Sequence, residues 1–104
     1  LEQEKTIFNI GKYSFDYQKR LLSNELEVQK LTSKENDLLR LLCLNEGKVL
    51  ERTYALKAIW EDDNYFNARS MDVYIAKLRK HLKQDDSIEI MNVHGRGFRF
   101  MVHK

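Results

Sequence analysis

Apolar and polar residues follow two different periods along this chain. Up to about residue 31, and again after about residue 87, they alternate, which is typical of β-strands that bury one face. Between these stretches the apolar residues recur every three or four positions, which is typical of amphipathic helices. The pattern predicts an α+β fold with an N-terminal sheet over residues 1–31, three helices within residues 32–82 and a C-terminal hairpin over residues 88–103.

The N-terminal stretch is expected to form four short strands. They cover residues 7–10, 13–17, 20–23 and 26–29, with turns at Gly11-Lys12 and Asn24-Glu25, where Asn tolerates a left-handed backbone. In the last strand Leu26 and Val28 alternate with Glu27 and Gln29. The simplest architecture is a four-stranded antiparallel meander that is polar on one face.

The first helix begins with a capping signal. Thr32 and Glu35 have the spacing of a capping box, in which each side chain bonds the backbone N–H of the other residue. Apolar residues follow at helical spacing, and Asn45-Glu46-Gly47 is expected to end the helix with a glycine cap. Cys43 lies on or beside the apolar stripe, and without a partner motif it is interpreted as a core residue rather than a reactive thiol.

A second helix is predicted over Arg52–Trp60, after a short extended segment at Val49-Leu50. Its core side would be formed by Leu56, Ile59 and Trp60. Residues 61–67 show no period and contain three acids, so they are expected to form a loop held in place by its two aromatic residues. Asn67 is the expected cap of the next helix.

The third helix, predicted over Arg69–Leu82, has two contrasting faces. An apolar stripe that would dock on the core consists of Met71, Ile75, Leu78 and Leu82. The opposite, cationic face holds Arg69, Val73, Ala76, Lys77 and Lys80, with Lys83 just beyond the end. Such cations suit phosphates and base acceptors in a DNA major groove, and small apolar side chains suit thymine methyl groups. Taken alone, the segment also fits an ordinary amphipathic surface helix.

The last segment is expected to be a β-hairpin with Val93-His94-Gly95-Arg96-Gly97 at its tip. Helix, short strand, helix, loop, helix and hairpin is the element order of a winged helix-turn-helix, in which the third helix enters the groove and the hairpin is the wing. In this arrangement Trp60, Leu78 and Phe100 are expected to be largely buried in one core.

Composition agrees with one globular domain of 104 residues, 42% apolar and 33% charged. Net charge is +2, but residues 1–68 hold 10 basic and 12 acidic residues whereas residues 69–104 hold 8 basic and 4 acidic ones. The basic surplus therefore lies with the third helix and the hairpin, which indicates a polyanionic partner. Because the first residue is not Met, the chain is expected to be a fragment or a processed product.

Nothing in the sequence indicates an enzyme. The three histidines and the single cysteine lack metal-ligand spacing, so no metal and no cofactor is expected. No apolar run is long enough to span a membrane, and one cysteine fits a reducing cytoplasm.

Several motifs together carry a family resemblance. They are Leu31-Thr32 with Glu35, the Trp60 that ends the second helix, Arg69–Ile75 with Leu78-Arg79-Lys80, and Val93–Phe100. Over nearly the whole chain these resemble the DNA-binding output domain of OmpR/PhoB-type response regulators, of which the N-terminal four-stranded sheet is also a mark. The resemblance implies sequence-specific binding of double-stranded DNA and control of transcription through phosphorylation of a receiver domain, which is expected to be absent from this chain.

The resemblance also implies residue roles and partners. Phosphates would be contacted by Arg69, Tyr74 and Arg79, and bases would be faced by Val73, Ala76, Lys77 and Lys80. Residues Glu61, Asp62, Asp63, Asn64 and Tyr65 would lie where some relatives meet RNA polymerase. Two copies would bind a direct repeat through paired receiver domains, which a sensor histidine kinase would phosphorylate, and the isolated domain would be monomeric.

The wing departs from the family pattern at two positions. Relatives often have Arg at the position of His94 and Tyr at that of Phe98. A long cation at a hairpin tip can enter a narrow minor groove, so Arg96 is expected to make this contact, with His94 assisting only when protonated. The alternative function is a winged-helix module that binds an acidic protein partner.

Overall fold

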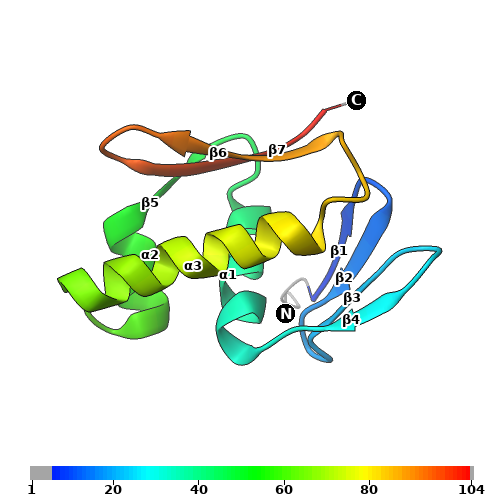
Figure 1. Ribbon diagram of the computed structural model, residues 1–104, viewed down its shortest axis with the longest axis horizontal. Helices are drawn as coiled ribbons and strands as arrows, with labels where there is room; N and C mark the ends of the chain where they lie inside the picture. The colour runs from blue at the N-terminus through cyan, green and yellow to red at the C-terminus, as the bar shows by residue number, and fades with distance from the viewer. Residues whose placement is uncertain (1–5, 104) are drawn as a thin grey trace, which may run out of the picture.

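A computed structural model describes residues 6–103, in which one sheet lies above three helices and the other lies to their right (Figure 1). The N-terminal sheet contains β1 (Ile7–Ile10), β2 (Tyr13–Asp16), β3 (Leu21–Ser23) and β4 (Val28–Lys30). The helices are α1 (Ser33–Leu44), α2 (Arg52–Trp60) and α3 (Tyr65–His81). The second sheet contains β5 (Val49–Glu51), β6 (Ile88–Val93) and β7 (Gly97–Val102). The predicted α+β winged-helix architecture is confirmed, although residues 1–5 and 104 of the expected domain lie outside the described part.

The N-terminal sheet is an antiparallel meander in the order β1-β2-β3-β4, as predicted. Phe8, Phe15 and Leu22 lie side by side across three strands and are buried, with the two phenylalanine rings stacked at 5.8 Å between centroids. The third strand begins at Leu21 rather than Arg20, because Arg20 adopts a left-handed turn with φ 57°. This apolar row is the sheet's contribution to the core.

The expectation for the fourth strand is wrong in its bounds and in its orientation. Leu26 lies before β4, and Leu26 and Val28 are 78% and 66% exposed. The residue beside Leu22 in the register is Gln29, whose side chain bonds α3. The preceding turn depends on the side chain of Asn24, which accepts the backbone N–H groups of residues 26 and 27 at 2.9 Å, and not on a left-handed backbone. Alternation in the sequence reveals the period but not which set of residues faces the core.

The caps of α1 agree with the prediction at one end only. Thr32 Oγ1 accepts the N–H of Glu35, and a carboxylate oxygen of Glu35 accepts the N–H of Thr32 at 2.8 Å, which completes the capping box. At the other end Asn45 is the cap, and the predicted glycine cap is wrong. Gly47 lies beyond it with φ +81° and donates its N–H to the Phe100 carbonyl at 2.8 Å, so this glycine shapes the connection to the second sheet.

Helix α3 begins earlier than predicted. Asn64 is its N-cap and accepts the N–H of Asn67 at 2.9 Å, so the assignment of Asn67 as the cap and of residues 61–67 as one loop is wrong. Both asparagines suit a cap, and sequence alone does not choose between them. Tyr65 and Phe66 do not hold a loop in place: they are 66% and 78% exposed and pack edge to face on each other.

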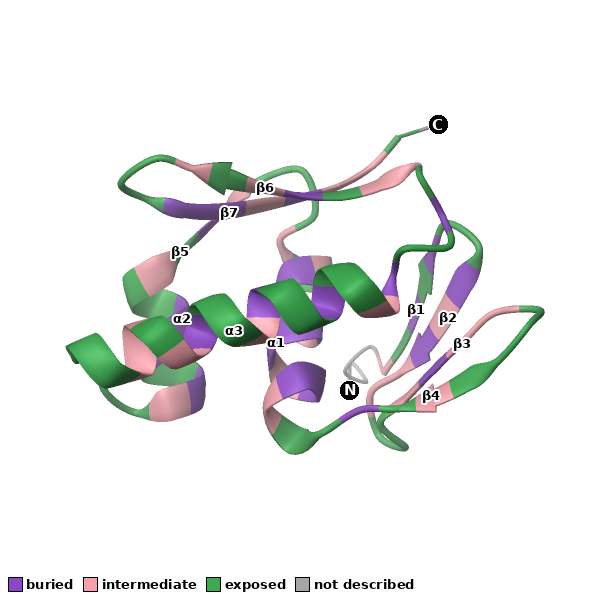
Figure 2. Cartoon of the chain, in the orientation of Figure 1, coloured by how far each residue is buried: buried purple, intermediate pink, exposed green. Residues whose placement is uncertain are grey.

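The apolar stripe of α3 is buried as predicted (Figure 2). Its four members, Met71, Ile75, Leu78 and Leu82, are at most 3% exposed. Leu78 and Phe100 lie in one core, whereas Trp60 is only partly buried against its edge, contrary to the expectation of deep burial. Cys43 is likewise partly buried against the core, in agreement with a packing role.

The predicted hairpin is part of a three-stranded sheet in the order β5-β7-β6. Gly95 turns the tip with φ +72°. At Gly97 an added Cβ would lie 2.0 Å from the carbonyl oxygen of Leu50, so the close approach of β5 to the wing requires glycine. The wing is therefore anchored to the segment that joins α1 and α2.

A buried carboxylate ties the N-terminal sheet to the loop after α3. Asp85 accepts the Lys12 N–H at 2.7 Å, the Ser87 N–H at 2.9 Å and the Ser87 hydroxyl at 2.6 Å. These bonds, those from Ser87 first, hold the pKa of Asp85 below its ordinary value of 3.8. For Glu35 burial acts to raise the pKa, but hydrogen bonds from Thr32 and His81 outweigh it, and the pKa lies below 4.5.

Replacing Leu78 by Ala should destabilise the domain by about 2–5 kcal/mol, because it opens a cavity in the fully buried stripe. The exposed Val73→Ala on the same helix should change the free energy of unfolding by less than about 0.5 kcal/mol. Chemical denaturation of both variants measures the difference. Equal stabilities would mean that the two faces of α3 are assigned in reverse.

Stability should fall as pH is lowered through the acidic range. A carboxylate whose pKa is lowered by folding contributes stability that is fully present above its unfolded pKa and is lost as pH falls through its folded pKa. Asp85 and Glu35 both act in this direction, with ordinary values of 3.8 and 4.5. Melting temperatures recorded from neutral to acidic pH should show a flatter decline in Asp85→Asn than in the exposed neighbour variant Asp86→Asn. The same decline in both variants would contradict the role given to Asp85.

Candidate nucleic-acid interface

The outward face of α3 is exposed along the helix, as Figure 2 shows. It carries the five residues predicted for it, Arg69, Val73, Ala76, Lys77 and Lys80, and one acid that the prediction omitted, Asp72. Val73 is 53% exposed, although it is apolar. A cationic surface with a small apolar centre is therefore open to a partner.

The middle of this face is supported by aromatic rings. Lys77 Nζ lies 4.9 Å from the centroid of the Tyr74 ring, and the centroids of the Tyr74 and Trp60 rings lie 5.8 Å apart. Lys34 Nζ lies 5.4 Å from the Trp60 ring and donates to the carbonyl of Ile59 at 2.7 Å. Contact with a ring restricts the freedom of a lysine side chain and favours its charge. Tyr74, which was predicted to contact a phosphate, is half-buried. Its ring contacts Lys77 and helps to position that side chain.

The N-terminal end of α3 holds Arg69 against an exposed aromatic. Arg69 donates to the Tyr65 hydroxyl at 3.1 Å, and its guanidinium lies 5.8 Å from the Tyr65 ring centroid. The sequence had separated these two residues into helix and loop, but they lie one helical turn apart. The early start of α3 therefore gives Arg69 a partner on its own helix.

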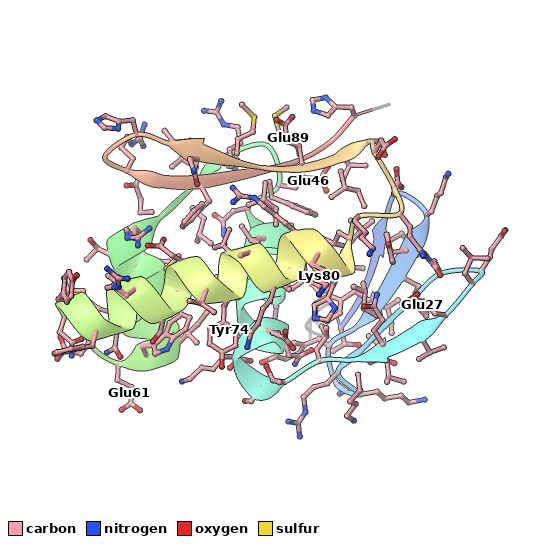
Figure 3. The ribbon with its side chains drawn as sticks, viewed as in Figure 1. Glu27, Glu46, Glu61, Tyr74, Lys80 and Glu89 are labelled. Carbon is pink, nitrogen blue, oxygen red and sulfur yellow. The ribbon has the colours of Figure 1, made fainter. Side chains whose placement is uncertain are left out.

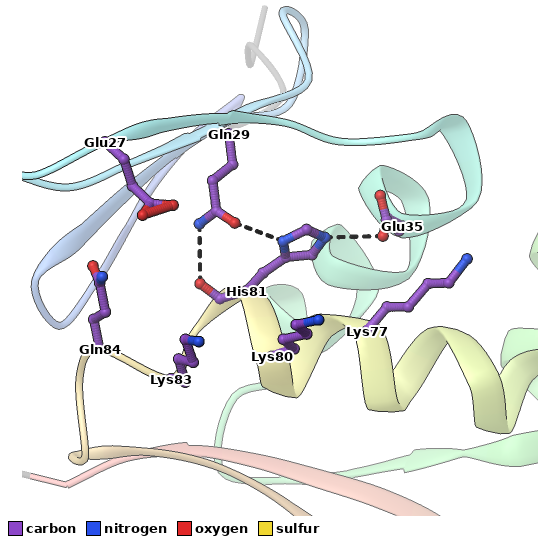
Figure 4. A pocket seen from close by; sticks show the side chains of 8 residues that line it. All are labelled: Glu27, Gln29, Glu35, Lys77, Lys80, His81, Lys83 and Gln84. Carbon is purple, nitrogen blue, oxygen red and sulfur yellow. Dashed lines mark hydrogen bonds and ion pairs between the residues drawn. The ribbon is translucent and has the colours of Figure 1, made fainter.

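The C-terminal end of α3 is fixed by a histidine (Figure 4). His81 Nδ1 lies 2.6 Å from Gln29 Oε1, and Nε2 lies 2.9 Å from Glu35 Oε2. Gln29 also donates to the His81 carbonyl at 3.0 Å. Each ring nitrogen therefore lies within hydrogen-bond distance of a side-chain oxygen on another element. The network joins α3 to β4 and to the capping box of α1, and no local sequence signal indicated it.

A shallow hollow of about 490 Å³ lies beside this network, at the end of the outward face of α3. Three lysines, Lys77, Lys80 and Lys83, line it together with Glu27. The lysine side chains project from α3 and the turn after it, and Glu27 approaches from the strand side (Figure 4). The hollow continues the cationic surface of α3 toward the N-terminal sheet.

A second hollow, of about 590 Å³, separates α3 from the wing. Its polar lining includes Arg52, Asp72, Arg79, Asn92, His94 and Arg96. Arg79 donates from Nε and Nη2 to the Ile90 carbonyl at 3.1 and 2.6 Å, and from Nη2 to Asn92 at 3.3 Å. The predicted phosphate contact Arg79 therefore braces β6 against the helix.

The other two arginines of this hollow form ion pairs. Arg96 Nη2 lies 2.6 Å from a carboxylate oxygen of Glu51, and Arg52 Nη2 lies 2.7 Å from Asp72. Sequence reasoning predicted Arg96 at the tip but neither its partner nor the second pair, because the partners are 45 and 20 residues apart. His94 is exposed at the tip.

The segment predicted to face RNA polymerase lies near the other end of α3 from His81. Glu61, Asp62, Asp63, Asn64 and Tyr65 are all exposed. Glu61 is the left-handed C-cap of α2 and lies at the lower edge of the molecule in Figure 3. The structure thus keeps this acidic group apart from the lysine-lined end of α3.

The described part of the chain, residues 6–103, shows neither a metal cluster nor a membrane-spanning helix. In that range no three His, Cys, Asp or Glu side chains gather into a possible metal site. None of the helices there is both long and apolar enough to cross a membrane.

Comparison with known proteins agrees with this geometry. Residues 26–100 match the family model "Transcriptional regulatory protein, C terminal", which describes regulators and not enzymes. The chain is 58% identical over 99 residues to the transcriptional regulatory protein RprY of Bacteroides fragilis. The aligned residues cover 95% of this chain and 42% of that protein. The chain spans about two fifths of the length of the curated relatives it matches.

Two solved structures are similar over most of the chain. The DNA-binding domain of Klebsiella pneumoniae RstA, in complex with the RstA box, has a TM-score of 0.78 at 26% identity, covering 95% of this chain and 100% of that chain. Thermotoga maritima DrrB, an OmpR/PhoB homolog, has a TM-score of 0.76 at 26% identity, covering 94% of this chain and 45% of that chain. With its four-stranded N-terminal sheet, cationic third helix and wing, the chain belongs to the OmpR/PhoB family of response regulators, as their C-terminal winged-helix DNA-binding domain.

Proposed function

We propose that this domain reads double-stranded DNA with the outward face of α3 in the major groove and the tip of the β6–β7 hairpin over the adjacent minor groove. The observation that carries the proposal is the exposed cationic face of α3, fixed at one end by His81 and braced against the wing by Arg79. Base edges would meet Val73, Ala76, Lys77 and Lys80. The RstA domain, which is bound to its DNA box, supports DNA over an acidic protein as the partner.

The proposed phosphate contacts do not all act alike. Arg69 is exposed at the start of α3 and is available to a DNA backbone. Tyr74 is half-buried and is proposed to act mainly by positioning Lys77. Two nitrogens of Arg79 are already bonded to β6, so Arg79 is proposed to hold the wing at the spacing that lets helix and hairpin meet one duplex together.

In the wing, Arg96 is proposed as the minor-groove contact, with His94 assisting when protonated. Arg96 lies between Gly95 and Gly97, which leave the tip without other bulk, and its side chain is 58% exposed. The narrow minor groove of A·T-rich DNA has a negative potential that attracts arginine. This arrangement supports a preference for A·T pairs beside the major-groove site.

The rest of the regulator enters the proposal through its relatives. RprY is more than twice as long as the part matched here, and a receiver domain that responds to a sensor histidine kinase in the cytoplasm is proposed for the remainder. Two copies would then occupy a direct repeat, while the isolated domain is monomeric. The exposed residues Glu61–Tyr65 are proposed as the surface that meets RNA polymerase.

The function is tested by titrating the domain with a DNA duplex selected from a random library. The logarithm of the binding constant should fall linearly with the logarithm of salt concentration, by about 0.9 for each phosphate neutralised. Poly-glutamate serves as the competitor that represents an acidic protein. The protein-binding alternative would be favoured if poly-glutamate bound as tightly as the duplex, or if the binding constant for DNA did not change with salt concentration.

Lys77→Ala should flatten the preference for one base pair of the selected site by about 1–3 kcal/mol, because Lys77 is proposed to face a base edge. Lys19→Ala, on the exposed turn between β2 and β3, removes the same charge outside α3 and should leave the selected motif unchanged. Library selection repeated with both variants gives the comparison. An unchanged motif in Lys77→Ala would exclude Lys77 from base recognition.

A further inference from the structure

Each arginine that lines the hollow between α3 and the wing already has a partner inside the domain. Arg52 pairs with Asp72, Arg79 with the backbone of β6, and Arg96 with Glu51. The lysines on the outward face of α3 differ, because no carboxylate within residues 6–103 forms an ion pair with Lys77 or Lys80. The lysines can therefore contact DNA directly, whereas Arg96 must first break its ion pair with Glu51.

The backbone places Glu51 next to Arg96. Glu51 is the last residue of β5 and lies opposite Gly97 in the register with β7. The N–H of Arg52 donates to the carbonyl of Arg96 at 2.9 Å, so the two strands are bonded where the wing turn begins. This anchor keeps Glu51 and Arg96 adjacent in the fold, within reach of an ion pair.

Within residues 6–103, the Glu51 side chain pairs with Arg96 and does not cap α2. Glu51 is the N-cap residue of α2, where Ser, Thr, Asp and Asn are preferred, yet its side chain makes no capping bond. Its carboxylate is directed to Arg96 at 2.6 Å instead. Both partners are about half exposed, at 58% and 49%, so the pair contributes little to folding and can open.

We propose that Glu51 sets the strength of DNA binding by holding the wing cation Arg96 inside the free domain. When the domain binds DNA, Arg96 leaves the Glu51 carboxylate and enters the minor groove. The free energy needed to break the ion pair therefore lowers the observed affinity for DNA. An exposed pair of this kind shifts such an equilibrium by about two- to fivefold. The inference rests on the proposed function, because it requires Arg96 to reach the DNA.

A double-mutant cycle tests this role with the selected duplex and four proteins: wild type, Glu51→Gln, Arg96→Ala and the double variant. Glu51→Gln should bind about two- to fivefold more tightly at low salt, and this gain should shrink as salt screens the pair. Arg96→Ala should bind more weakly than wild type. In the double variant the gain from Glu51→Gln should be absent, because its target has been removed.

Two further variants separate masking from charge alone. Glu89→Gln removes a half-exposed wing carboxylate that pairs with His103 at 2.9 Å, and its affinity should match wild type. Glu51→Asp keeps the charge but shortens the reach to Arg96, so it should show part of the gain. Unchanged melting temperatures establish that the variants are folded.

The outcomes distinguish the inference from the proposal beneath it. If Glu51→Gln binds no more tightly, or gains equally without Arg96, Glu51 does not act by masking the arginine and the inference fails. If Arg96→Ala binds as wild type does, the wing contact of the proposed function fails, whatever Lys77→Ala shows for α3.

Discussion

The arrangement of this domain depends on the burial of one side of α3. Its apolar stripe is buried in the core and consists of Met71, Ile75, Leu78 and Leu82. Burial of this stripe fixes the rotation of the helix about its axis. Once that rotation is fixed, the cationic side faces outward without any specific contact to hold it there. The core beneath α3 is built from α1, α2 and strands of both sheets. In Figure 1 the sheet of the wing lies above α3 and the N-terminal sheet lies to its right.

Polar contacts then fix the parts around α3 in three places. Asp85 joins the β1–β2 turn to the loop after the helix, His81 joins the helix end to β4 and α1, and Arg79 joins the helix to β6. Asp85 is buried, His81 is half-buried, and Arg79, although exposed, forms partly buried hydrogen bonds to Ile90. Removing one partner would leave the other without a hydrogen bond. Three such contacts set the relative positions of sheet, helix and wing, on which the proposed simultaneous contact with two grooves depends.

The parts of the structure that could be predicted from the sequence are those set by local pattern. Hydrophobic period assigned the helices, the faces of α3 and the hairpin, and the capping box assigned the start of α1. The pattern failed where two local solutions were equally good: Asn64 and Asn67 both suit a cap, and either set of β4 residues could face inward. Only tertiary packing, here the bond from Gln29 to α3, decides such cases.

The site was predictable in composition but not in pairing. The exposed residues of α3 and the tip arginine were identified, yet the partners of Arg79, Arg96 and His81 come from segments 11 to 52 residues away. Nothing in a single sequence reports contacts at that separation. The same limit explains why Trp60, at the edge of the core and in contact with Tyr74, was expected to be more deeply buried than it is.

Because Val73 and Ala76 are exposed, the stability of the fold and the surface that α3 presents to a partner can change independently at these positions. Neither residue belongs to the core, so substitution at these positions leaves the fold's stability almost unchanged while it alters the exposed surface proposed to face a base pair. Lys77 is less independent, because its contact with Tyr74 couples it to Trp60. If α3 reads DNA as proposed, a new operator preference can evolve, or be engineered, most freely at 73 and 76 on an unchanged scaffold. A change at 77 would instead call for a compensating change in the Tyr74–Trp60 pair.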